Sequence, residues 1–170
     1  MWRTHLFAGA TAGLLLTVPN PDPKVVAVSA GIAGVSALLP DIDSPESKLG
    51  RLIPILPTVL TVTVGHRGLL HSLVGALGIS LVASLLIKIW YASTFLEIFP
   101  LVLAGYITHL LLDSMTNSGC PWVYPIKTHI GIPLLSTGSF IERLIVSPAM
   151  MVLFAWFSGP MVWSYVKNLI

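Results

Sequence analysis

Apolar runs separated by short polar turns make up most of the 170-residue chain. Five of them are candidates for membrane-spanning helices, and they cover residues 6–18, 25–39, 69–90, 96–115 and 140–166. The first is short for the ~20 apolar residues that a span needs, unless its helix begins near Trp2. Clusters of Pro, Asn, Asp, Gly and Ser between the runs are typical of turns. This pattern predicts an all-α polytopic membrane helix bundle with about five transmembrane helices.

A sixth apolar run, residues 52–64, does not fit this pattern. It has 13 residues and is broken by prolines at positions 54 and 57. Apolar runs of ~10–14 residues are typical of re-entrant or interfacial segments. We therefore expect residues 52–64 not to cross the membrane.

The short basic start of the chain is also compatible with a signal peptide. No clear small-x-small cleavage site precedes the polar residues 19–23, so we expect this helix to be retained. The loops are too short for a separate soluble domain. Residues 1–170 are therefore expected to form a single integral membrane domain.

The composition supports a membrane protein. Hydrophobic residues make up 55% of the chain and charged residues only 9%, against about 25% charged residues in soluble domains. The formal net charge of +2 is too small to indicate a nucleic-acid partner. The single cysteine, Cys120, excludes an intramolecular disulfide and a Cys-rich zinc site.

The basic residues predict the orientation, because cytoplasmic loops carry an excess of Lys and Arg. If the N-terminus is cytoplasmic and residues 52–64 do not cross, six basic residues lie inside and three outside. The six are Arg3, Lys48, Arg51, Arg67, Lys127 and Arg143, and the three are Lys24, Lys88 and Lys167. The same orientation brings most of the His and Asp residues to one membrane face.

Two carboxylates, Asp41 and Asp43, stand two residues apart in the polar stretch after the second run. With Glu46 they place three of the chain's seven acidic residues within six positions. In a membrane protein such side chains cost free energy unless they pair, bind a cation or face water. Alternate residues of a turn can point the same way, so both carboxylates are candidate metal ligands.

His109 and Asp113 are spaced i, i+4 on a predicted helix, which puts both side chains on one face a turn apart. This spacing suits two ligands of a cation, or a His–Asp hydrogen bond that only holds two helices together. His66 and His71 flank the start of the run at 69–90. One lies in the loop and the other about one turn inside the helix, so the two side chains can converge.

With His5, these residues give seven candidate metal ligands near one membrane face. They are His5, Asp41, Asp43, His66, His71, His109 and Asp113. Nitrogen and oxygen ligands without thiolates suit a divalent cation such as zinc, manganese or iron, and seven are more than one tetrahedral ion uses. We therefore expect a centre with one ion or two, which would activate water and clamp phosphoryl oxygens.

Two further charged residues are candidates for a catalytic role. Arg67, between the histidines of its motif, is suited to holding a phosphate or pairing with an Asp. Glu142 is a candidate acid or base, or a partner of a ligand, and the alternative is an interfacial ion pair with Arg143 or another charge.

The motifs together resemble those of a known family. They are Thr-His at 4–5, Leu-Leu-Pro-Asp-Ile-Asp at 38–43, Gly-His-Arg-Gly-x-x-His-Ser at 65–72, Gly-x-x-x-His-x-x-x-Asp at 105–113 and Thr-Gly-Ser-x-x-Glu at 137–142. In this order they resemble the bacterial membrane-bound metal-dependent hydrolases, the YdjM-like inner-membrane proteins that are also called LexA-binding, inner membrane-associated hydrolases. The resemblance implies a multi-pass protein of the bacterial inner membrane and a distant similarity to zinc-dependent phospholipase C.

Two functions of different classes fit these residues. The first is hydrolysis of a phosphoester, in a lipid or a lipid-linked small molecule, by metal-activated water at the cytoplasmic face. The second is a metal-binding transporter or ion relay without hydrolytic activity, whose site would lie near the bilayer midplane. A purely structural metal is a third alternative. The candidate ligands lie at helix ends and in loops, which favours the enzyme.

Overall fold

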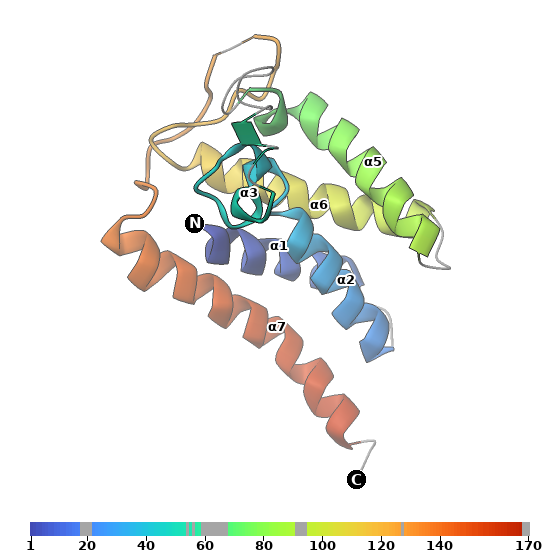
Figure 1. Cartoon of the computed structure of the whole chain (residues 1–170). Helices are drawn as coiled ribbons and strands as arrows, with labels where there is room; N and C mark the ends of the chain where they lie inside the picture. The colour runs from blue at the N-terminus through green and yellow to red at the C-terminus, as the bar shows by residue number, and fades with distance from the viewer. Residues whose placement is uncertain are drawn as a thin grey trace.

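The computed structural model describes residues 1–17, 22–53, 55, 57–58, 68–90, 95–126 and 128–167. Six α-helices are described, namely α1 Trp2–Thr17, α2 Pro23–Ser36, α3 Lys48–Leu52, α5 Leu73–Trp90, α6 Phe95–Ser114 and α7 Ser147–Lys167 (Figure 1). The described residues also form two 3₁₀-helices, η1 Pro40–Asp43 and η2 Leu69–His71, and a π-helix, η3 Glu142–Val146. The described part of the chain pairs strand-like residues only in two isolated β-bridges, so the predicted all-α class is confirmed.

Three described helices are long and apolar enough to cross a membrane: Pro23–Asp43, Glu97–Ser114 and Glu142–Lys167. This is fewer than the about five predicted, and the reason is length. Helix α1 has 16 residues, which at ~1.5 Å per residue gives about 24 Å against a hydrocarbon core of ~30 Å. The apolar part of α5, Leu73–Ile89, is likewise one of the shorter apolar helices.

Small residues bring α1, α2 and α6 together around Ala33, which is fully buried in α2. A Cβ placed on Gly9 of α1 would lie 2.6 Å from the Ala33 carbonyl oxygen, and one on Gly105 of α6 would collide with the same oxygen. Such small-residue contacts are how membrane helices approach each other closely. Helix α5 packs against α6, and α7 packs mainly against α1 (Figure 1).

One end of the bundle collects the polar elements. Helix α1 begins there, α2 leads into η1 there, and η2 contacts η1. Helix α3 also contacts η1, so the elements on both sides of residues 53–68 lie at this end. The prediction that residues 52–64 do not cross falls mainly outside the described residues, but its flanks agree with it. We call this end of the bundle the ligand end.

Candidate metal centre

Four side chains of the ligand end direct one ligand atom each toward a common point. His71 Nε2 and His109 Nε2 lie 3.4 Å apart, and Asp113 Oδ2 lies 3.7 Å from each of them. Asp41 Oδ1 lies 3.8 Å from His109 Nε2 and 4.0 Å from His71 Nε2. Ligand atoms on a tetrahedral zinc ion, at ~2.0–2.1 Å from the metal, are about 3.3–3.4 Å apart. These five distances are therefore at, or slightly beyond, tetrahedral spacing.

Helix α6 supplies two of these side chains from one face. His109 and Asp113 are both buried, as their i, i+4 spacing predicts. Tyr106, one turn before His109, is fully buried and its hydroxyl donates a 2.6 Å hydrogen bond to the Leu70 carbonyl. This bond ties α6 to η2, whose last residue is His71.

Hydrogen bonds and charges behind the imidazoles fix how the rings face. The Nδ1–H of His109 donates to the carbonyl oxygen of Ala37, at 2.8 Å, which leaves Nε2 of the neutral ring free of its proton. His71 Nδ1 lies 3.8 Å from Asp43 Oδ2. A carboxylate or carbonyl on the far nitrogen is the usual partner of a metal-binding histidine.

The two carboxylates of η1 therefore occupy different positions. Asp41 faces the two Nε2 atoms, and its side chain is 27% exposed. Asp43 faces Nδ1 of His71 from behind, and its side chain is 1% exposed. Because they are two residues apart in a tight 3₁₀ turn, the same turn presents one carboxylate to each side of His71.

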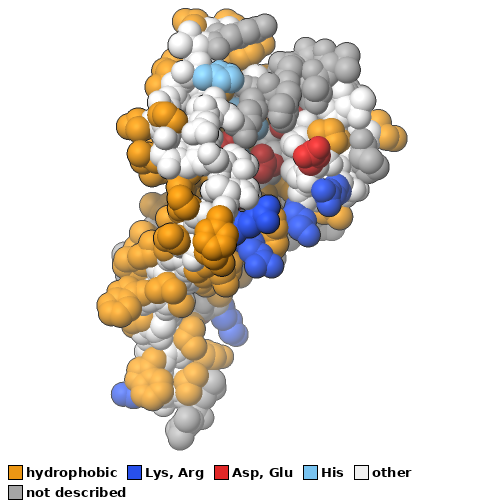
Figure 2. All heavy atoms as spheres, turned by 90° about the vertical axis from the view of Figure 1, so that its left-hand side faces the viewer, with side chains coloured by type: hydrophobic (Ala, Val, Ile, Leu, Met, Phe, Trp, Pro, Cys, Tyr) orange, Lys and Arg blue, Asp and Glu red, His pale blue; other side chains and the backbone are white. Residues whose placement is uncertain are grey.

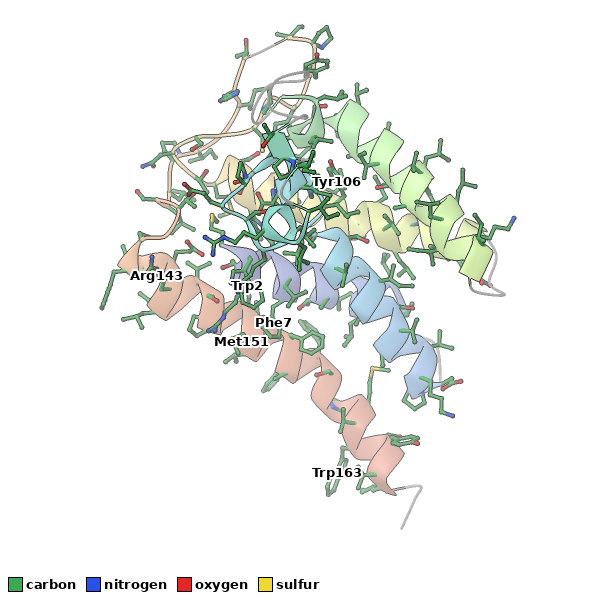
Figure 3. All side chains as sticks on the ribbon, viewed as in Figure 1. Trp2, Phe7, Tyr106, Arg143, Met151 and Trp163 are labelled. Carbon is green, nitrogen blue, oxygen red and sulfur yellow. The ribbon has the colours of Figure 1, made fainter. Side chains whose placement is uncertain are left out.

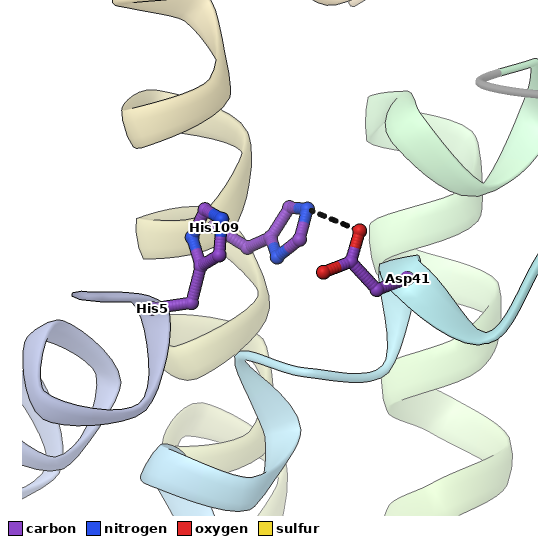
Figure 4. Close-up of side chains that lie close together, drawn as sticks. All are labelled: His5, Asp41 and His109. Atoms are coloured by element: carbon purple, nitrogen blue, oxygen red, sulfur yellow. Dashed lines mark ion pairs between the residues drawn. The ribbon is translucent and has the colours of Figure 1, made fainter. Parts of the chain in front are cut away.

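His5 adds a second group of ligand atoms. Its ring stacks on that of His109, with centroids 4.0 Å apart and planes at 20°, and its Nε2 lies 3.4 Å from Asp113 Oδ1. Figure 4 shows His5 from α1 beside His109, with Asp41 on the other side of His109. Ligand atoms of His5, Asp41 and His109 all lie within 4.8 Å of one another, as do those of His71, His109 and Asp113.

Asp113 therefore lies beside the histidines of both groups. Its Oδ1 faces His5, and its Oδ2 faces His71 and His109. Such a carboxylate would offer one oxygen to an ion held with His71 and His109, and the other to an ion held with His5. His109 offers only Nε2, because Ala37 takes Nδ1–H, so it serves one ion at a time.

Six of the seven predicted metal ligands thus come together, and the seventh, His66, lies outside the described residues together with Arg67. Glu142 is not part of the two groups formed by the described ligands. Its Oε1 accepts from Thr4 Oγ1 at 3.1 Å and lies 3.3 Å from the Met1 amine, and its Oε2 accepts from the Gly138 amide at 2.6 Å. It links the start of α1 to η3, one residue away from His5.

Tyr106 and the Ala37 carbonyl are site residues that sequence reasoning missed. Tyr106 could have been predicted from the sequence, since its i, i+3 spacing to His109 puts both residues on one helix face. The role of the Ala37 carbonyl could not have been predicted, because every residue has a backbone carbonyl and the residue type does not show which one accepts a hydrogen bond.

Basic side chains gather on the surface of the ligand end. The Trp2 ring lies under both Arg3 and Lys48, whose charged groups are 5.5 and 5.4 Å from its centroid. A polar pocket of about 400 Å³ beside it is lined by residues that include Arg3, Glu142 and Arg143. Figure 2 shows Lys and Arg side chains clustered on this face next to acidic ones.

Comparison with known proteins decides the family. A family model described as the YdjM inner membrane protein matches residues 1–168. The chain belongs to this family. It is 33% identical over 150 residues to the uncharacterized protein YvsG of Bacillus subtilis, covering 85% of this chain and 86% of YvsG.

Two Escherichia coli proteins are also similar. The inner membrane protein YdjM is 32% identical over 127 residues, which cover 72% of this chain and 61% of YdjM. The inner membrane protein YbcI is 30% identical over 124 residues, or 72% of this chain and 65% of YbcI. No solved structure matches the chain. With its apolar spans, the family confirms the predicted multi-pass location in the bacterial inner membrane.

Proposed function

We propose that this protein is a membrane-embedded, metal-dependent hydrolase that cleaves a phosphoester of a lipid or lipid-linked substrate at the cytoplasmic membrane face. The observation that carries the proposal is the convergence of His71, His109, Asp41 and Asp113 at 3.4–4.0 Å. These ligand atoms lie at the end of two helices that are long and apolar enough to span a membrane, which is where we expect the lipid headgroups.

The donor set fits a divalent cation. Two neutral imidazoles and two carboxylates balance a charge of 2+, and buried ionisable groups in a membrane are expensive without such compensation. Nitrogen and oxygen ligands at near-tetrahedral spacing favour zinc, with manganese or iron as alternatives. His5 and the second oxygen of Asp113 offer two ligand atoms to a second ion.

A bound divalent cation supplies two things here, a lowered pKa for water and charge stabilisation at phosphoryl oxygens. The chain's own residues supply the rest. Asp43 and the Ala37 carbonyl hold the two imidazoles with Nε2 toward the centre. Asp41 is the most exposed of the four side chains, so we expect a substrate to approach the centre from its side.

Positive charge for the substrate phosphate comes from more than one source. We assign Arg67 to the phosphate on the basis of its motif, although it lies outside the described residues. Arg3 and Lys48, beside Trp2, place two further charges at the same end of the bundle. Glu142 remains a candidate acid or base in our proposal, but its contacts with Thr4 and Gly138 favour a positioning role for the start of α1.

A metal-binding transporter or ion relay is the second candidate, favoured by the burial of His5, His71 and His109 within a membrane protein. Transport sites commonly lie near the midplane between broken helices. Here Asp41 and Asp43 sit in η1, after α2, and His109 and Asp113 lie in the last turns of α6. This position near a membrane face is why we prefer hydrolysis.

The experiment is to measure bound metal and phosphatase activity of the purified protein with phosphatidic acid, a prenyl phosphate and phosphatidylglycerol. We expect His71→Ala to lower metal affinity by more than about 100-fold, because ligand loss should exceed the 10–100-fold effect of changing a ligand's partner. The control is His129→Ala, since His129 is exposed in the loop after α6. Full metal content in His71→Ala would contradict the site, and hydrolysis that survives it would contradict the mechanism.

A further inference from the structure

A long apolar groove runs between α1, α2 and α7. Its volume is about 650 Å³, within the ~300–1,000 Å³ of typical ligand pockets. Small residues such as Ala27, Ala30 and Gly31 form its floor on α2, and Phe154 and Met161 stand on the α7 side. The groove is therefore deep because its floor is made of short side chains.

The groove exists because α7 packs on α1 and makes few contacts with α2. Phe7 of α1 and Phe154 of α7 meet with ring centroids 5.8 Å apart, and Figure 3 shows Phe7 in the space between these helices. Phe154 and Met161 pack on a buried cluster of Ala10, Leu14, Val26 and Ala30. Contacts between α2 and α7 are sparse by comparison.

The groove runs along the helices, from the ligand end of the bundle toward the opposite end. Leu6, Phe7 and Val35 line it toward the ligand end, and Lys24 and Tyr165 line it at the other end. From Leu6 to Leu14 it follows α1 for about 12 Å, at ~1.5 Å per residue. An apolar slot with this orientation matches a hydrocarbon chain that stands along the bilayer normal.

At its ligand end the groove comes within one helical turn, along α1 and α2, of residues of the candidate metal centre, although none of the described candidate ligands lines it. Leu6 follows His5 directly, and Ala37, which holds His109, lies one turn beyond Gly34 of the floor. Arg3 and Lys48 lie on the same end, around Trp2. A chain in the groove would carry its anionic headgroup toward positive charge and toward the candidate metal ligands.

From this arrangement we infer that the groove between α1, α2 and α7 binds one long hydrocarbon chain of the phospholipid-like substrate whose phosphoester lies at the metal centre. The inference rests on the proposed hydrolase function. The substrate class is then a long-chain lipid phosphoester, and short-chain or water-soluble phosphoesters would lack the packing contacts that the groove offers to a long chain.

The chain offers a matched pair of variants to test this. A Cβ added at Gly31, which lines the groove, meets nothing within 4 Å, and the same holds for Gly78 on α5, which does not line it. The variant Gly31→Leu therefore places its Cβ without a clash and extends its side chain into the groove, and Gly78→Leu is the control. Ser158→Phe fills the groove from the α7 side. If both variants have the same effect, that effect is due to filling the groove and not to a local disturbance of α2 by Gly31→Leu.

The first readout is labelling by phosphatidic acid with a diazirine in one acyl chain, in nanodiscs of phosphatidylethanolamine and phosphatidylglycerol. We expect labelled peptides from α1, α2 and the groove side of α7, and a loss of about tenfold or more in Gly31→Leu and Ser158→Phe. Gly78→Leu should label like the wild type. Labels spread equally over α5, or unchanged labelling in both groove variants, would overturn the inference.

The second readout is hydrolysis of dioleoyl and dihexanoyl phosphatidic acid by the metal-loaded protein. We expect the groove variants to lose about tenfold in kcat/KM on the long-chain lipid only, with unchanged metal content. Equal losses on both lipids would overturn the groove but leave the hydrolase. If the wild type hydrolyses neither lipid while labelling stays in the groove, the proposed hydrolase function is wrong. The groove would then still be a binding site for a hydrocarbon chain.

A second copy of the protein is the competing occupant. Native mass spectrometry of the same samples decides this, because a dimer that Gly31→Leu dissociates would overturn the inference. A monomer that carries co-purified lipid in the wild type, and loses it in Gly31→Leu, would support it.

Discussion

Helices α6 and α7 are both long enough to span a membrane, yet they are packed very differently. In the span Glu97–Ser114, 50% of the residues are buried inside the protein. In the most apolar 18-residue window of Glu142–Lys167, only 6% of the residues are buried. In lipid, apolar surface gives helices no reason to associate, and small or polar residues decide where they pack closely. Helix α6 carries Gly105, His109 and Asp113, and none of the five candidate ligands grouped among the described residues lies on α7.

The contrast teaches that the candidate metal centre and the tight packing belong together. His5, His109 and Asp113 come from the two helices that close on Ala33 of α2. Helix α7 is tied mainly to α1, and Figure 3 shows its Trp163 directed away from the other helices. Because α7 makes few contacts with α2, the apolar groove between them stays open.

The strongest test of this contrast is to spoil the packing of α6 without touching a ligand. A methyl group on Gly105 would collide with the Ala33 carbonyl, so Gly105→Ala should cost about 1–3 kcal/mol and reduce metal binding by moving α6. Gly78→Ala is the matched control, because a Cβ there meets nothing within 4 Å. Denaturant unfolding and metal content report both effects; equal behaviour of the two variants would break the comparison.

A smaller effect should come from the residue behind His71. Asp43→Asn keeps the side-chain shape but removes the charge 3.8 Å from His71 Nδ1. We expect about a tenfold loss of metal affinity, the lower end of the 10–100-fold range for such partners. Titration with zinc in a competing chelator measures it. Asp22→Asn is the control, since Asp22 caps the exposed start of α2 and Asn caps equally well; a similar loss there would sink the assignment.

The smallest expected changes in the free energy of unfolding come from replacing one aromatic side chain, either a buried one on α6 or an exposed one on α7. Tyr106→Phe removes a buried hydrogen bond to the Leu70 carbonyl and should cost about 1 kcal/mol. Trp156→Leu on α7, where the ring is 75% exposed, should change stability by less than about 0.5 kcal/mol. Unfolding in detergent or lipid measures both. A larger loss in Trp156→Leu would mean that α7 is held more tightly than its contacts indicate.

Much of the fold followed from apolar patterning, because a membrane helix must satisfy its own backbone and must be long and apolar. The patterning predicted an apolar helix at each of the five positions, but it overestimated how many are long enough to span. The end of each helix depends on caps and close contacts. Helix α2 stops at Ser36, and η1 takes up the next turns, although the apolar run continues to Leu39.

Residue types and helical spacing were enough to predict His5, Asp41, His71, His109 and Asp113 as candidate ligands. They also predicted that His109 and Asp113 share one face, because that is a local property of a helix. Arg67 and His66 stay predictions.

Only the tertiary structure decided how these residues divide the work. It set Asp41 toward the Nε2 atoms and Asp43 behind His71, turned the two oxygens of Asp113 to different imidazoles, and took Glu142 to Thr4. It also left α7 apart from α2, which made the groove. The physical reason is that sequence spacing fixes direction within one helix, whereas convergence between helices depends on how closely their small residues let them approach.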